Sequence, residues 1–263
     1  METKMIQGDN FGGIKDTSPV DLGCSRVLFW DTLLQRRCAG GIASVDASNC
    51  YDQVVHNVAS LSARKWGMPA MAMLCILSTI SMMSFHLRTS FGQSTQTYGG
   101  NKVHPFQGLC QGNGRAPGLW LCLACLLAEY LHSKGHTIEV VSPFTLTLLV
   151  LAALLFVDDV DLLSVSPSSS ATRDDLLPTM QASINTWEGG LIVTGGALKH
   201  TKCKFQTVGF KWRDGNWTYA KPSTTPILKI RGEDDSEHTI DYIEHTEAIE
   251  VVGLLQADRK SVV

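Results

Sequence analysis

The sequence predicts an α+β fold, in which helices pack on one face of a small antiparallel sheet. Two observations predict the sheet and one predicts the helices. The apolar segments 144–157 and 161–165 flank Asp158 and Asp159, which is typical of a β-hairpin with both acids at its tip. A short apolar run also ends in an acid near residue 46. Apolar residues recur at helical spacing elsewhere, and a long apolar helix is expected after Pro117.

The elements are expected in a definite order along the chain. They are a strand at 42–46, a helix capped by Ser48 or Asn49 and ending before Gly67, a helix at 69–83, a hairpin from Phe85, a Gly-rich loop at 107–116 and the long apolar helix. The hairpin around Asp158 follows, then a loop at 166–170, a helix at 171–188 with a kink expected at Pro178, a turn into a strand at 193–205, and a hairpin at 208–220 with Asp214–Gly215 near its turn. Less order is expected after about residue 220, where a basic stretch is followed by an acidic one.

Composition limits the function classes. The chain has 263 residues, 44% of them hydrophobic, which allows one large domain or two small ones with a core. The net charge of −3 gives no overall basic footprint, so a nucleic-acid partner has to be argued from local features. The N-terminus lacks the apolar core of a signal peptide. The longest apolar run, 144–157, is shorter than the roughly 18–20 residues of a membrane span.

The eight cysteines are scattered and are interpreted as reduced thiols, typical of an intracellular protein, nuclear or cytoplasmic. Cys122 and Cys125 form a CxxC inside the apolar helix, but no second CxxC or His pair accompanies them, so a zinc or redox role is disfavoured.

Asp46, Asp158 and Asp159 form the candidate catalytic group. Each lies at the end of a predicted strand, and neighbouring strands would bring the acids together. Carboxylate oxygens match Mg²⁺, and two such ions roughly 3.5–4 Å apart support in-line phosphoryl transfer. By itself, an Asp pair more often marks a solvated turn than a catalytic site. The catalytic interpretation therefore depends on the order of the surrounding segments.

Six segments resemble, in order, the motifs of reverse transcriptases of the non-LTR retrotransposon type. They are QGDNFGGIKDTSPVDL (7–22), VDASNCYD (45–52), QGLCQGNGRAPGLW (107–120), FVDD (156–159), GGALKHTKCKF (195–205) and VVGLLQADRK (251–260). The resemblance implies a polymerase palm at 41–220, partial fingers at 1–40, a charged connector with a primer-grip-like segment at 221–263, and a missing thumb.

The implied function is that of an RNA-directed DNA polymerase, a nucleotidyltransferase that adds a dNTP to a primer 3′-OH with two Mg²⁺ ions, or Mn²⁺ in their place. The implied partners are an RNA template, a DNA primer, dNTP and other parts of a larger retroelement polyprotein, with no membrane. The chain is then expected to be a fragment of a longer retroelement protein or a degenerate copy.

The resemblance also assigns roles to residues. Asp46, Asp158 and Asp159 would be the catalytic carboxylates and metal ligands, with the backbone carbonyl of Ala47 as a further ligand. Tyr51 would be the steric gate that excludes a ribose 2′-OH.

Binding and proton transfer are assigned to other positions. Gln111 and Gly112 would contact template and nucleotide, and Lys15 would hold nucleotide phosphates. Lys202 would lie near the triphosphate and donate a proton to the leaving pyrophosphate, with Lys199 as the competing choice.

Some positions depart from the motifs. Ala116 stands where Ser is usual, and Ile14 and Thr17 replace the fingers arginines. Two alternatives stay open. One is a catalytically silent relic that binds RNA weakly, and the other is an RNA-dependent RNA polymerase, against which Tyr51 and Phe156-Val157 argue.

Overall fold

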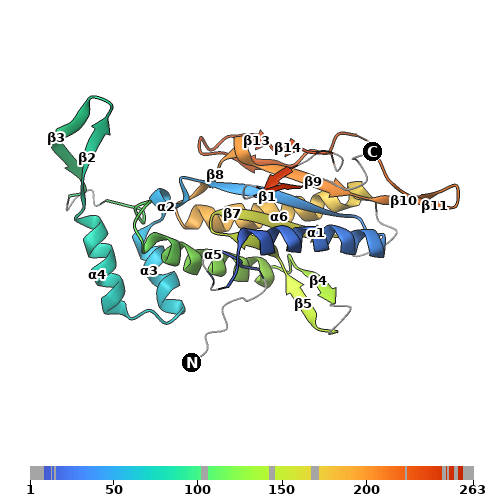
Figure 1. Ribbon diagram of the computed structural model, residues 1–263, viewed down its shortest axis with the longest axis horizontal. Coiled ribbons are helices and arrows are strands. Elements are labelled where there is room, and N and C mark those ends of the chain that lie inside the picture. The colour runs from blue at the N-terminus through green and yellow to red at the C-terminus, as the bar shows by residue number, and fades with distance from the viewer. Residues whose placement is uncertain are drawn as a thin grey trace.

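A single mixed sheet forms the centre of the computed structural model, which describes residues 9–12, 14, 16–101, 106–141, 146–166, 172–222, 224–244, 247, 249–251 and 254–256 (Figure 1). Its strand order is β14-β9-β1-β7-β6, with β8 paired to β1. The strands are β1 (Gly40–Ser48), β6 (Ala153–Phe156), β7 (Asp159–Val165), β8 (Ala197–Leu198), β9 (Lys204–Val208) and β14 (Asp241–Tyr242). Strand β1 is antiparallel to β7, β8 and β9, as the sequence predicts, and β14 is parallel to β9.

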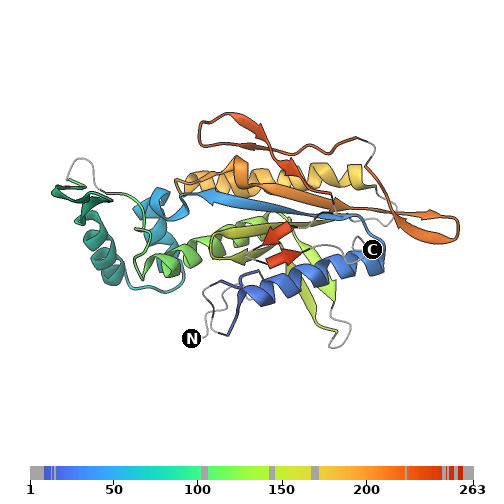
Figure 2. The ribbon, with the colours of Figure 1, turned by 45° about the horizontal axis from the view of Figure 1, so that its top comes forward.

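Helices cover both faces of this sheet, which corrects the prediction of helices on one face (Figure 2). Along β1, Ile42 packs in one buried cluster with Leu22 and Leu33 of α1 (Pro19–Arg36). Its neighbour Ala43 points to the other cluster, which contains α3 (His56–Lys65), α5 (Ala116–Ser133) and α6 (Arg173–Val193). The alternation follows from the two-residue period of a strand.

Helix α1 was not predicted from the sequence. Its buried positions are Leu22, Arg26, Phe29 and Leu33, which share one helix face. The charged Arg26 interrupts the apolar stripe and hides the pattern. The helix starts with a capping box, in which Asp21 Oδ2 accepts from the backbone N–H of Ser18 at 2.7 Å.

The helix expected before Gly67 is divided into α2 (Cys50–Gln53) and α3. The break follows from a tertiary contact, since the N–H of Val55 donates to Thr194 O at 2.9 Å instead of continuing the helix. Helix α4 (Ala70–Ser81) and the long helix α5 form where they were expected, with Pro117 in the first turn of α5. Helix α6 extends to Val193 and keeps Pro178 within it.

The apolar run 144–157 was expected as one strand, and the structure corrects this. Strand β5 (Leu148–Leu151) pairs with β4 (Ile138–Val141), which was not predicted, and only β6 joins the central sheet. An apolar run carries no local signal for the break at Ala152. The break is instead fixed by a tertiary contact with the N-terminal segment. The buried carboxylate of Asp9 accepts from the N–H of Ala152 at 2.6 Å.

Residues near the N-terminus close the outer edge of β6. Leu155 donates its N–H to Asp9 O at 2.7 Å, and its carbonyl accepts from the N–H of Phe11 at 2.8 Å. The other carboxylate oxygen of Asp9 lies 2.6 Å from His132 Nε2 on α5. This segment therefore acts as an additional short strand and leaves β6 without an exposed edge.

Smaller hairpins surround the sheet. Figure 1 shows β2 (Ser84–Thr89) with β3 (Gly92–Gly99) and β10 (Phe210–Arg213) with β11 (Asn216–Tyr219) projecting from opposite ends of the molecule. Both hairpins were predicted. The turn of the second is Asp214–Gly215, with φ of 51° and 78°, as a type I′ turn requires. Strand β15 (Ile249–Val251) pairs with β16 (Leu254–Gln256).

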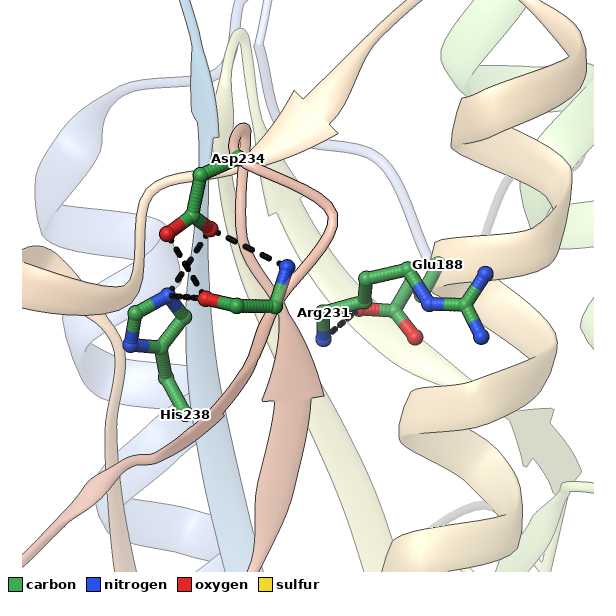
Figure 3. A network of polar contacts seen from close by, with 5 residues as sticks. Glu188, Arg231, Asp234 and His238 are labelled. Atoms are coloured by element: carbon green, nitrogen blue, oxygen red, sulfur yellow. Dashed lines mark hydrogen bonds and ion pairs between the residues drawn. The ribbon is translucent and has the colours of Figure 1, made fainter.

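Residues 224–244 are more ordered than the sequence suggested. Strands β12 (Lys229–Arg231) and β13 (Glu237–Thr239) form a hairpin on α6, whose Glu188 accepts from the N–H of Arg231 at 2.5 Å (Figure 3). In the connecting turn, Asp234 Oδ1 lies 2.9 Å from His238 Nε2. The sequence did not predict these strands, because the apolar residues here are few and scattered. The predicted domain boundaries stay a prediction.

Candidate active site

The tip of the β6–β7 hairpin carries the predicted Asp pair. Phe156 is paired with Asp159, so Val157 and Asp158 are the two turn residues. Val157 has φ of 59°, in the left-handed region that a β-branched residue rarely adopts. Its carbonyl accepts from Trp120 Nε1 of α5 at 2.6 Å.

Asp46 lies opposite Asp159 in the register of β1 and β7. Directly opposed residues of an antiparallel pair have Cβ atoms about 4.5–5.5 Å apart and side chains on the same face. Asp46 is half-buried and Asp159 is exposed. The structure thus brings the predicted carboxylates of residues 46, 158 and 159 to one edge of the sheet, and their catalytic role stays a prediction.

The clustered acids affect each other electrostatically. Desolvation of the carboxyl group by the neighbouring elements, followed by the negative charges of Asp158 and Asp46, raises the pKa of Asp159 to about 6. Lys202 acts in the opposite direction. The cluster therefore carries more negative charge than its own cations neutralise, which is the condition under which a carboxylate site attracts a metal ion.

Lys202 belongs to the same site. It lies on the short 3-10 helix η1 (His200–Lys202), directly after β8, and its Nζ is 2.9 Å from Asp46 Oδ2. This hydrogen bond is the main cause of its raised pKa. Lys199, the competing choice, donates its backbone N–H to Asp46 O at 2.9 Å. Lys202 thus contacts the carboxylate through its side chain and Lys199 through its backbone.

The 3-10 helix that carries Lys202 is packed against the β12–β13 hairpin. The ring of His200 stacks on the ring of His238, with centroids 3.9 Å apart and an interplanar angle of 4°. His238 is held in turn by Asp234, as Figure 3 shows. No local sequence pattern indicates this support, because it joins segments almost forty residues apart.

Tyr51 lies on α2, next to the carboxylates. Its half-buried ring is tilted against Trp120, with centroids 6.0 Å apart. Burial raises the pKa of Tyr51 to about 12, with smaller contributions from Cys50 and Asp158. The hydroxyl therefore stays protonated at neutral pH. The ring packs against the core, so the position suits both a core aromatic and a gate beside the acids.

The predicted template-binding loop is exposed at its tip. Gly112 has φ of 88°, and a Cβ placed there would meet nothing within 4 Å. Gln111 is exposed, and its N–H donates to Asp52 Oδ1 at 3.5 Å. Gly108, to which the sequence motifs assigned no role, has much less space around it. A Cβ added to Gly108 would lie 2.5 Å from Asp52 O.

The remaining predicted site residues are placed only in part. Ala47 is buried in β1 opposite Leu198. Lys15 lies outside the described residues, as does much of the segment 251–260. Thr17, which replaces a fingers arginine, donates its hydroxyl to Phe11 O at 2.5 Å and so serves the local backbone.

A buried ion pair lies two residues further along β7. Arg26 Nη1 is 2.5 Å from Asp161 Oδ2, and the side chains are 1% and 5% exposed. Ser44 Oγ donates to the other carboxylate oxygen of Asp161 at 2.5 Å. The carboxylate of Asp161 is therefore bonded to α1 and β1, whereas no such bond joins Asp159, on the same face, to α1 in the described part of the chain.

The chemistry of the donor set fits a hard divalent cation, because Asp46, Asp158 and Asp159 offer carboxylate oxygens at one sheet edge. Their present arrangement is not that of a ready-made ligand set. Within the described part of the chain, no group of three or more His, Cys, Asp and Glu side chains is placed to hold a metal ion. Asp46 is bonded to the ammonium group of Lys202 instead.

Comparisons with known proteins concern the fold alone. No protein-family model and no curated protein matches the chain. Among solved structures, telomerase from Candida albicans in complex with a TWJ fragment of telomeric RNA is similar at a TM-score of 0.50 and 13% identity, over 88% of this chain and 36% of that chain. Telomerase from Candida tropicalis with the same kind of RNA fragment gives 0.49 and 11% identity, over 88% and 33%.

The structure is therefore a mixed α/β fold similar to that of telomerase, a relative of reverse transcriptases. This supports the predicted class of fold. The chain spans 36% of the Candida albicans telomerase chain, so the activity and partners of a whole polymerase are matters of proposal. Among the described helices, none combines the length and apolar character that crossing a membrane requires.

Proposed function

We propose that this chain is the palm-containing part of an RNA-directed DNA polymerase of the non-LTR retrotransposon type. The observation that carries the proposal is the register that sets Asp46 opposite Asp159, with Asp158 at the adjacent turn. The order of the sequence motifs and the telomerase-like fold support it. The partners are then an RNA template, a DNA primer and dNTP.

Asp46, Asp158, Asp159 and the Ala47 carbonyl would hold two Mg²⁺ ions, or Mn²⁺. When bound, the ions would supply charge stabilisation and activation of the primer 3′-OH for in-line transfer. The raised pKa of Asp159 agrees with this assignment, because it reflects first the desolvation of the carboxyl group and then repulsion by Asp158 and Asp46, which a cation would relieve.

Lys202 would hold a proton at its Nζ, close to the acids. Its raised pKa keeps the ammonium charged at neutral pH, and its exposed side chain is free to move from Asp46 to an incoming triphosphate. There it would neutralise phosphate charge and protonate the leaving pyrophosphate. Tyr51 would limit the space beside the sugar of the nucleotide.

Incorporation of labelled dNTP on a primed RNA template with Mg²⁺ or Mn²⁺ tests the proposal. Asp158→Asn is expected to lower incorporation by ~100-fold or more, since the lost charge stabilisation is worth several kcal/mol. The matched control is Asp31→Asn, which changes an exposed carboxylate on α1 and is expected to behave as the wild type. Equal activity of wild type and Asp158→Asn would refute the proposal.

One observation favours a second candidate, a silent relic that binds RNA weakly. In the described residues the acids do not form a metal-ligand set, and Lys202 neutralises Asp46. Salt-dependent RNA binding without any incorporation, in wild type and Asp158→Asn alike, would favour this candidate.

A further inference from the structure

The turn that carries Asp158 is strained. Val157 has φ of 59°, where its branched Cβ crowds the backbone. A residue in this region persists only when the surrounding structure holds it there, and such residues cluster at functional sites. The contacts of Val157 therefore show what fixes the position of Asp158.

Two elements hold this turn from different directions. Trp120 of α5, 1% exposed, donates its Nε1–H to the carbonyl of Val157 at 2.6 Å. The N-terminal segment packs against the preceding peptide group, between Phe156 and Val157, since a Cβ at Gly12 would lie 2.2 Å from Val157 N. The carbonyl bonded by the indole belongs to the peptide group that enters Asp158, so the bond constrains the direction in which Asp158 leaves the turn.

The same indole contacts the ring of Tyr51, with centroids 6.0 Å apart and an interplanar angle of 57°. One rigid, buried side chain therefore touches the turn before Asp158 and the ring predicted to limit the nucleotide sugar. Tyr51 and Asp158 lie on different elements, and Trp120 joins them.

We propose that Trp120 is a positioning residue, which fixes the Val157 carbonyl and thereby orients Asp158 toward Asp46 and beside Tyr51. The effect of Trp120 on catalysis rests on the proposed polymerase function. The hydrogen bond by which Trp120 holds the strained turn does not depend on that function. Misplacement of a reacting group by about 1 Å can lower a rate by ~100-fold, so the hydrogen bond matters to rate even though Trp120 does not touch substrate.

The test compares Trp120→Phe with Trp187→Phe. Trp120→Phe keeps an aromatic ring beside Tyr51 but removes the N–H donor. Trp187 of α6 is equally buried in the same core, and among the described residues no hydrogen bond joins it to the turn, so it controls for loss of core volume. Trp120→Phe is expected to lower kcat for dNTP incorporation on the order of 10- to 100-fold, with little change in KM for dNTP. Equal kcat values for the two variants would overturn the inference.

A second measurement does not depend on activity. In the wild-type protein, NMR is expected to show a through-hydrogen-bond scalar coupling between the Trp120 indole nitrogen and the Val157 carbonyl carbon. Its absence would overturn the inference, even if Trp120→Phe proves inactive or unfolded. If the coupling is present and the wild type incorporates no dNTP, the polymerase proposal fails while the positioning role of Trp120 stands.

The substitution Val157→Gly separates a positioning role of Trp120 from a general effect on stability. Glycine adopts positive φ without a Cβ penalty, so the turn needs less external support. The kcat loss from Trp120→Phe is therefore expected to be smaller in a Val157→Gly background than in the wild type. If Trp120→Phe lowers kcat by the same factor in both backgrounds, Trp120 has no role in holding the turn.

Discussion

The ring of Tyr51 lies at the boundary between the core and the carboxylates. It packs against Trp120 on one side, and its raised pKa partly reflects the charge of Asp158. The contact with Trp120 supports the ring on one side, as a residue that discriminates by shape requires. If Tyr51 is a gate, the space that its ring occupies decides which sugar is accepted.

Tyr51→Ala is expected to raise incorporation of ribonucleotides relative to deoxyribonucleotides by roughly 10- to 200-fold, because a pocket contact of this kind is worth about 1–3 kcal/mol. Tyr51→Phe keeps the ring and is expected to keep the wild-type preference. Tyr130→Ala, at an exposed position on α5, controls for loss of an aromatic ring. Competition between labelled rNTP and dNTP measures the ratio, and an unchanged ratio in Tyr51→Ala would exclude the gate.

Sequence patterns predict the roles of some site residues but not of others. Asp46 and Asp159 end apolar runs and belong to motifs in a fixed order, so their proximity was predicted. Trp120, although it ends the segment 107–120, was assigned no role, and Arg26 lies outside these motifs. Their roles come from partners 37 and 135 positions away along the chain, which no local pattern reveals.

Helix α1 is fastened to the sheet by one buried ion pair. Arg26 and Asp161 are almost completely buried, so loss of one partner leaves an uncompensated charge in the interior. The apolar residues Leu22 and Leu33 pack on either side of it along the helix.

Arg26→Met is expected to lower the free energy of unfolding by about 3–5 kcal/mol, because Asp161 stays buried without its cation. Chemical denaturation measures this loss. Arg26→Met with Asp161→Leu is expected to recover much of the stability. Lys229→Met breaks the exposed Lys229–Glu237 pair and is expected to change stability by about 0–1 kcal/mol. Similar losses from Arg26→Met and Lys229→Met would contradict the account of α1.

Two glycines of the 107–116 loop offer a matched comparison. Gly108 and Gly112 have nearly equal φ values, 86° and 88°, but only Gly108 is crowded by the backbone of Asp52. Gly112→Ala is expected to cost about 1–2 kcal/mol of stability from backbone strain alone. Gly108→Ala is expected to cost about 1–3 kcal/mol more, because the loop must also move away from Asp52. Equal losses in denaturant unfolding would show that this crowding is unimportant.

The elements that the sequence predicted well have strong local signals, such as Pro117 at the start of α5 and Asp214–Gly215 in the last predicted hairpin. The elements that it missed depend on distant partners. Strand β6 is separated from β5 by the carboxylate of Asp9, and α2 ends where Val55 bonds to Thr194. Local pattern cannot show either contact.

The molecule as a whole places its sheet between α1 and the layer of α5 and α6. Asp46 and Asp159 lie on the face of the sheet that α1 packs against, at the end of β1 where β8 and η1 return toward Asp46. Chain segments from residue 46 to residue 238 thus meet at one edge. The likeness to telomerase extends over 88% of the chain, which agrees with a single polymerase-like fold rather than an isolated motif.

The central claim is that strands β1, β6 and β7 bring Asp46, Asp158 and Asp159 together as one cation-binding centre. Titration with Mn²⁺, followed by electron paramagnetic resonance, tests it most directly. Loss of even an outer-shell partner weakens metal binding ~10- to 100-fold, so Asp46→Asn and Asp159→Asn are each expected to weaken it at least about tenfold, while Asp31→Asn binds as the wild type does. Wild-type affinity in Asp46→Asn and Asp159→Asn would contradict the claim.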